Sequence, residues 1–176
     1  SEVDDYYLIV SRLREYKRID RAIEAFNALG RPLLIIGEGS DRARLQKLAG
    51  KNITFLGKVD EETLQNHYAR CRALIFPGEE DFGLTPVEAM ASGRPVIAFG
   101  RGGALETVAD GVTGCFFNDP TSESLADAVM SFDASAMDAQ TIRNHALQFD
   151  VTHFKQKIED HIKMCIEGNA PCSVNA

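Results

Sequence analysis

The sequence has no excess of basic residues, no closely spaced cysteine pair and no long apolar run. Its 176 residues include 19 Lys and Arg against 26 Asp and Glu, which gives a formal net charge of −7. A general nucleic-acid-binding protein usually presents a basic face, so this balance argues against that class. It is compatible with phosphate binding, because a few cations and backbone amides can bind one diphosphate locally.

The cysteine spacing and the lack of apolar runs exclude further classes. The four cysteines are far apart, at Cys71, Cys115, Cys165 and Cys172. Without a Cys-x-x-Cys pair, a zinc site or a disulfide framework is not indicated, and reduced thiols fit better. No apolar run approaches the roughly 18 residues that a membrane span needs, and no charged-then-apolar signal segment is visible. These features predict a cytoplasmic protein.

Short apolar, β-branched runs alternate with amphipathic helical patterns along the chain. The runs are apolar throughout, as in strands that are covered by helices on both faces. Repeated β-α units with short links predict an α/β fold with one doubly wound, parallel, six-stranded sheet. The expected strands are 7–11, 32–36, 53–57, 73–77, 95–99 and 114–117. The expected helices are 18–29, 41–49, 61–71, 86–91, 103–108, 122–132, 136–147 and 152–167.

The length fits a single domain, which we expect over residues 1–168, with a frayed tail at 169–176. In doubly wound sheets, ligands bind outside the carboxyl ends of the strands. Arg12 ends the first expected strand, and Lys17 lies in the loop that follows. Segments 37–40, 79–85 and 100–103 follow the second, fourth and fifth strands. These segments are therefore expected to converge on one edge of the sheet.

Glu88 has two open interpretations. Thr85-Pro86-Val87-Glu88 fits a capping box, with Thr85 as the N-cap and Glu88 bound to its backbone amide. Alternatively, the Glu88 carboxylate accepts a pair of vicinal hydroxyls, such as those of a ribose. The local sequence alone favours the capping box.

Glu80 stands in a run of three acids, which is usually a solvated loop. Phe82-Gly83 follows it and indicates a sharp turn of the backbone, which favours a site. Arg12 and Lys17 suit a diphosphate: the Arg12 guanidinium can donate two parallel hydrogen bonds, and the Lys17 ammonium acts as a point charge. Both residue types are also common on surfaces, so neither interpretation is settled by these residues alone.

Two glycine-rich turns are also candidates. Gly37-Glu38-Gly39-Ser40 resembles the start of a dinucleotide-binding fingerprint, but it lacks the third glycine, and a tight strand-to-helix turn is favoured. Gly102-Gly103 opens an expected helix, where exposed amides would favour an anion. A plain helix-entry turn is the alternative there. The four histidines have no nucleophile or metal-ligand spacing around them, and we assign them no catalytic role.

Taken together, these blocks resemble the C-terminal domain of a retaining glycosyltransferase of family 4 with the GT-B architecture. The matching segments are Ser11-Arg12-Leu13…Lys17, 36–39, 55–57, 80–84 with 88–98, and Gly102-Gly103…Glu106. Ser11 departs from the usual glycine. The resemblance covers most of the chain, and the run 81–108 also resembles mannosyltransferases of lipopolysaccharide O-antigen assembly.

The resemblance implies a role for each matching residue. Arg12, Lys17 and Glu80 would be catalytic: the two cations would hold the donor diphosphate and stabilise the leaving group, and the carboxylate would contact the donor sugar. Glu88 would bind the ribose hydroxyls. The remaining substrate-binding positions would be Gly37, Phe55, Leu56, Gly57, Phe82, Gly83, Leu84, Thr85, Gly102 and Gly103.

The resemblance further implies transfer of a hexose from a GDP- or UDP-linked donor, with retention and without a bound metal or other cofactor. GT-B enzymes have two domains, and six strands account for this chain, so we expect a donor-binding domain that is inactive alone. Its partners would be the nucleotide sugar and an N-terminal domain, which could also provide peripheral membrane contact. The alternatives are a non-catalytic, Rossmann-like nucleotide-binding module and a structural domain.

Overall fold

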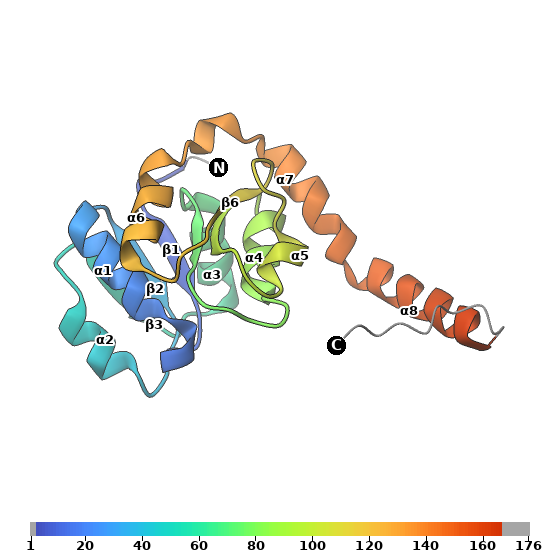
Figure 1. Ribbon diagram of the computed structural model, residues 1–176, viewed down its shortest axis with the longest axis horizontal. Coiled ribbons are helices and arrows are strands. Elements are labelled where there is room, and N and C mark those ends of the chain that lie inside the picture. The colour runs from blue at the N-terminus through green and yellow to red at the C-terminus, as the bar shows by residue number, and fades with distance from the viewer. Residues whose placement is uncertain (1–2, 167–176) are drawn as a thin grey trace.

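A six-stranded parallel sheet forms the centre of the protein in the computed structural model, which describes residues 3–166 (Figure 1). The strand order is β3-β2-β1-β4-β5-β6, and every neighbouring pair is parallel. The strands are β1 (Tyr7–Val10), β2 (Leu33–Ile36), β3 (Ile53–Gly57), β4 (Leu74–Phe76), β5 (Val96–Phe99) and β6 (Gly114–Phe117). The predicted doubly wound fold is therefore confirmed.

Helices cover both faces of the sheet (Figure 1). One face carries α1 (Ile19–Leu29), α2 (Arg42–Leu48) and α6 (Ser122–Ser131). The other carries α3 (Glu61–Arg70), α4 (Leu84–Ala91), α5 (Ala104–Thr107) and α7 (Ala139–Ala146). Successive strand residues point to opposite faces, so Tyr7 and Ile9 belong to one core cluster and Leu8 to the other. This two-sided burial explains why strands such as β4 and β5, in which every residue is buried, are apolar throughout.

Local capping sets several helix ends. Gly30 ends α1 in the left-handed conformation, with φ 66°. Asp60 begins α3, where its carboxylate accepts a hydrogen bond of 2.7 Å from the Thr63 amide. Three short 3-10 helices, η1 (Glu15–Lys17), η2 (Ala134–Ala136) and η3 (Leu147–Phe149), were not predicted.

Two helix boundaries differ from the prediction by more than one residue. The α4 helix begins at Leu84, two residues before the expected start, because Gly83 takes φ 78° and serves as its N-cap. The α7 helix is shorter than the expected 136–147, since Asp138 caps it by accepting from the Thr141 amide at 2.7 Å. The predicted tail at 169–176 lies outside the described residues.

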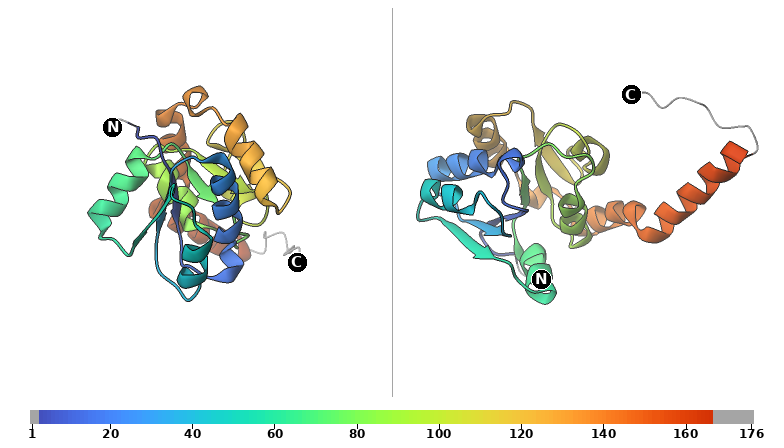
Figure 2. Two further views of the ribbon diagram at one scale, coloured as in Figure 1. Left: turned by 90° about the vertical axis from the view of Figure 1, so that its left-hand side faces the viewer. Right: turned by 90° about the horizontal axis from the view of Figure 1, so that it is seen from below.

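The last described helix, α8 (Val151–Ile166), projects away from the rest of the protein (Figures 1 and 2). All of its residues are exposed. Val151, Phe154, Ile158, Ile162 and Ile166 recur at spacings of three and four, which places them along one side of the helix. Within residues 3–166, no helix is both long and apolar enough to cross a membrane.

Candidate functional site

A cleft of about 750 Å³ lies at the carboxyl ends of the strands. Its walls come from the ends of β1 and β2, the segment after β3 and the start of α4. Five residues that the sequence singled out line it: Arg12, Gly37, Leu84, Thr85 and Glu88. These five residues therefore converge at this edge as expected, although Arg12 and Glu88 are 76 positions apart in the chain.

Two glycines allow the β2–α2 turn to approach the end of β1. Gly37 has φ 131°, and a Cβ there would lie 1.9 Å from the Ser11 carbonyl oxygen. A Cβ at Gly39 would lie 2.1 Å from the Leu13 carbonyl oxygen. No larger residue fits without moving the backbone, so this segment is the tight strand-to-helix turn that the sequence favoured. The close approach brings the turn beside Arg12, whose side chain is exposed.

Lys17 and Glu80 form an ion pair, which no local pattern in the sequence indicated. Their side chains are only 13% and 25% exposed. The Lys17 ammonium also lies 5.1 Å from the centre of the Tyr16 ring. Gly78, after β4, packs so closely on η1 that a Cβ would lie 2.8 Å from the Lys17 carbonyl oxygen. Glu80 is therefore a partly buried, paired carboxylate, which differs from the solvated-loop alternative.

The Gly102-Gly103 pair holds the Glu80 loop in place. The Gly103 amide donates to the Glu80 carbonyl at 2.7 Å. A Cβ at Gly102, where φ is 57°, would lie 2.5 Å from the same oxygen. The expectation of a free Gly103 amide for an anion is wrong in this structure, because the loop after β4 folds back onto it. We call this contact between residues 80–82 and 102–103 the loop clasp.

The capping-box interpretation of Glu88 is wrong. Thr85 is the second residue of α4 and not its N-cap, so Glu88 falls beyond the first turn. Its carboxylate instead accepts a 2.7 Å hydrogen bond from the Tyr68 hydroxyl on α3. Pro86 is tolerated in the first turn because its missing amide would have no partner within the helix.

Tyr68 is the residue that sequence reasoning missed. It is 2% exposed, and burial, followed by the hydrogen bond to Glu88, raises its pKa well above the usual value. Nothing local in the sequence pairs it with a carboxylate 20 positions away. Glu38 and Lys58 also line the cleft without having been singled out as site residues.

The other nine predicted residues, which include Lys17, Glu80 and the Gly102-Gly103 pair, lie outside the lining of this cleft. Gly57, at the end of β3, accepts a 2.8 Å hydrogen bond from the Gly37 amide, with Phe55 and Leu56 just before it. Phe82 is 40% exposed and meets the Phe149 ring edge-on, with ring centres 6.0 Å apart. Gly83 is buried, and a Cβ there would lie 2.9 Å from the ring of Phe76.

A second groove, of about 570 Å³, lies between α3 and α4. Glu88 and Leu64 line both this groove and the first cleft. Arg143, from α7, also lines the second groove. Glu88 therefore stands at the boundary between two openings.

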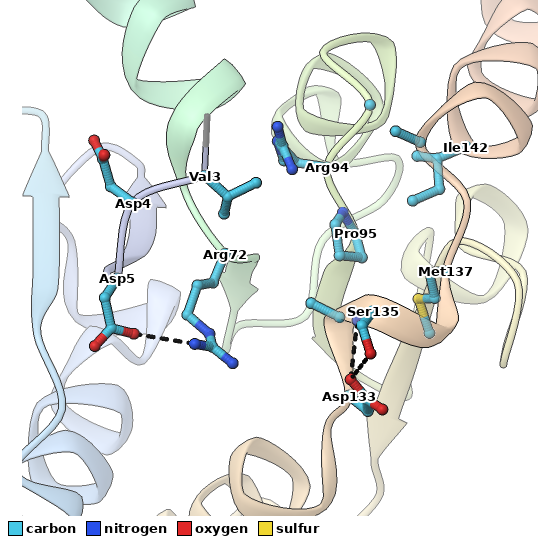
Figure 3. Close-up of a pocket in the computed structure, with 13 residues that line it drawn as sticks. Val3, Asp4, Asp5, Arg72, Arg94, Pro95, Asp133, Ser135, Met137 and Ile142 are labelled. Carbon is cyan, nitrogen blue, oxygen red and sulfur yellow. Dashed lines mark hydrogen bonds and ion pairs between the residues drawn. The ribbon is translucent and has the colours of Figure 1, made fainter. Parts of the chain in front are cut away.

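A third pocket, of about 520 Å³, lies at the opposite edge of the sheet, where β4 and β5 begin (Figure 3). Arg72 donates to Asp5 at 3.1 Å, and Asp133 accepts from the amide and hydroxyl of Ser135 at 2.9 and 2.7 Å (Figure 3). None of the predicted site residues lines this pocket.

Comparison with known proteins gives consistent matches. The family model described as "Glycosyl transferases group 1" matches residues 1–148. The alpha-1,3/1,6-mannosyltransferase ALG2 of Dictyostelium discoideum is 44% identical over 92 residues, which are 52% of this chain and 21% of that protein. The O-antigen chain mannosyltransferase C of Escherichia coli is 28% identical over 134 residues, covering 72% of this chain and 36% of that protein.

A solved structure agrees with the fold. HepE from Anabaena, in complex with UDP, superposes with a TM-score of 0.76 at 26% identity. The match covers 91% of this chain and 49% of HepE. The chain thus spans about half of HepE and about a third or less of the two mannosyltransferases.

Proposed function

The chain belongs to the glycosyl transferases of group 1, as a C-terminal domain of the GT-B type, and we propose that it binds the nucleotide-sugar donor for a hexosyl transfer. The observation that carries the proposal is the cleft at the carboxyl edge, where Arg12, Thr85 and Glu88 meet. A cation and the start of a helix suit the phosphates of a nucleoside diphosphate, and a carboxylate suits its ribose hydroxyls. UDP in the similar HepE structure supports this ligand class.

The proposal assigns the diphosphate to the cations and to the start of α4. Arg12 and Lys17 hold the phosphates and stabilise the charge that develops on the leaving group. The amides of Leu84 and Thr85 lie in the first turn of α4, where backbone donors have no partner within the helix and the helix dipole favours an anion.

The sugars and the base are assigned to the remaining walls. Glu88 accepts the ribose hydroxyls, and Glu80 contacts the donor sugar from the loop that follows β4. The segments at Gly37 and at 55–57 flank the base, and their backbones meet through the Gly37 amide and the Gly57 carbonyl. We extend the proposal to family 4 and to transfer with retention, with mannose as the first sugar to test, because two similar proteins are mannosyltransferases.

The proposal includes a partner domain. Relatives of the chain are two to five times longer than the part that they share with it. The α8 helix exposes an apolar side that no described residue covers. We place that side against an N-terminal domain of the same protein, which would supply the acceptor site.

Calorimetry tests the donor site. The chain is titrated with UDP, GDP, UDP-glucose and GDP-mannose, and the same titrations are repeated with Glu88→Ala. We expect one nucleotide series to bind, and Glu88→Ala to weaken it by about tenfold or more, because a hydrogen bond to a charged group is lost. Glu62→Ala, which removes an exposed carboxylate of α3, serves as the control and leaves the affinity unchanged. Binding of no nucleotide would favour the structural-domain alternative.

Turnover tests the role of the missing domain. Incubated with the nucleotide sugar that binds best and a panel of glycan and lipid-linked acceptors, the chain alone should transfer no sugar. Its extension by the N-terminal domain should restore transfer, with the anomeric configuration of the donor retained in the product. Robust transfer by the 176-residue chain would contradict the proposed division of labour.

A further inference from the structure

The hydroxyl of Tyr68 holds one oxygen of the Glu88 carboxylate. Tyr68 is buried on α3, in the core cluster between the sheet and the helices α3 and α4. Its hydroxyl donates to Oε2 of Glu88 at 2.7 Å. Burial first, and then the hydrogen bond to Glu88, raises the pKa of Tyr68, so the hydroxyl keeps its proton and acts as a donor. Glu88 itself is exposed, so a buried hydroxyl on α3 holds a carboxylate that lies at the surface.

Without the hydrogen bond from Tyr68, the Glu88 side chain could face either of two openings. Its side chain has several rotatable bonds and lines both the 750 Å³ cleft and the 570 Å³ groove between α3 and α4. Tyr68 and Arg143 both line the groove, and Tyr68 does not line the cleft, so the hydrogen bond holds only Oε2 on the groove side. Without that bond, Arg143 would attract the whole carboxylate into the groove. With Oε2 held by Tyr68, the carboxylate still has most of its roughly four acceptor positions for ligand hydroxyls.

We propose that Tyr68 is a positioning residue: by fixing Oε2 of Glu88 on the groove side, it leaves the other carboxylate oxygen directed at the donor cleft and so determines the preference for ligands with vicinal hydroxyls. The inference rests on the proposed function, because it assumes that a nucleotide occupies this cleft. Tyr68 acts only through Glu88 and need not touch the ligand.

The test compares nucleotides with and without the ribose hydroxyls. Calorimetry is performed on the 176-residue chain and on Tyr68→Phe, with UDP and GDP and with their 2′,3′-dideoxy counterparts. We expect Tyr68→Phe to weaken binding of the ribonucleotide by about tenfold, the usual loss for one hydrogen bond to a charged group. Affinity for the dideoxy counterpart should stay within about twofold. A general loss of packing would weaken both ligands equally.

Two controls isolate the pairing. Tyr6→Phe removes another hydroxyl bound to α3, since Tyr6 donates to the His67 carbonyl at 3.0 Å, but it lies away from the cleft. It should leave the preference for ribose unchanged. In a Glu88→Ala background, Tyr68→Phe should cause no further loss, because residues that act through one contact are not additive.

The outcomes separate the two proposals. If neither nucleotide binds the unchanged chain, the proposed function fails and the inference fails with it. If Glu88→Ala abolishes the preference for ribose but Tyr68→Phe preserves it, only the positioning role is overturned. The positioning role is also overturned if Tyr68→Phe weakens binding as much in the Glu88→Ala background as in the unchanged chain. Equal weakening for the ribonucleotide and its dideoxy counterpart would overturn it as well.

Discussion

Single residues of the candidate site are held by partners that lie far away in the sequence. Lys17 is paired with Glu80, and Glu88 is paired with Tyr68. The residue types could be selected from the sequence, because cations and carboxylates follow strand ends. Their partners could not, since each contact joins elements that come together only through the tertiary fold. The capping-box prediction for Glu88 was wrong because the N-cap of α4 is Gly83 and not Thr85, and a buried hydroxyl on another helix donates to the carboxylate instead.

The Lys17–Glu80 pair predicts that one substitution changes the affinity for a nucleotide and the affinity for its nucleotide sugar differently. Glu80→Gln removes the negative charge beside Lys17, so UDP or GDP should bind up to about fivefold more tightly, in line with the strength of partly exposed ion pairs. The corresponding nucleotide sugar should gain less or lose affinity, because Glu80 is proposed to contact the sugar. Calorimetry measures both. Glu79→Gln, at an exposed neighbour, is the control, and weaker UDP binding by Glu80→Gln would contradict the prediction.

At the scale of elements, the six strands could be predicted because each contains a short run of mainly apolar residues, which burial in the sheet requires. The boundaries of α4 and α7 could not. Gly83 starts α4 early through a left-handed conformation, and Asp138 starts α7 late through its cap. Both depend on backbone angles that the sequence only restricts. The projection of α8 likewise has no local signal, since an amphipathic pattern normally indicates a packed helix.

The close crossing of the β2–α2 turn over the end of β1 predicts a sharp contrast between two glycines. Gly37→Ala should destabilise the protein by at least about 3 kcal/mol, because its Cβ would overlap the Ser11 carbonyl in addition to the unfavourable φ. Gly30→Ala should cost only about 1 kcal/mol, since its φ is also positive but the space around it is open. Urea denaturation measures both, and equal losses would show that the crossing is not tight.

At the scale of the whole molecule, α8 contributes little to the described domain. No residue of α8 is buried, whereas α7 buries Ile142 and Ala146 in the core. The sheet and seven helices thus form the stable part. The apolar side of α8 belongs to the proposed contact with a further domain.

Truncation tests this division. Removal of residues 151–176 should change the free energy of unfolding by no more than about 0.5 kcal/mol and leave nucleotide affinity unchanged. Removal of residues 139–176 should prevent folding, because the core then loses Ile142. Thermal unfolding and calorimetry report both results. Marked destabilisation by the shorter deletion would show that α8 packs on this domain.

The strand order and the loop clasp also fix the order in which the site can be completed during synthesis. Each strand pairs with one that the ribosome has already made: β2 with β1, β3 with β2, β4 with β1, and β5 and β6 each with the strand before. A nascent chain can therefore extend the sheet outward without waiting for later strands. The Glu80 loop is the exception, because its carbonyl binds the Gly103 amide. A chain halted before residue 103 would hold most of the cleft but would leave the loop that carries Glu80 unfastened.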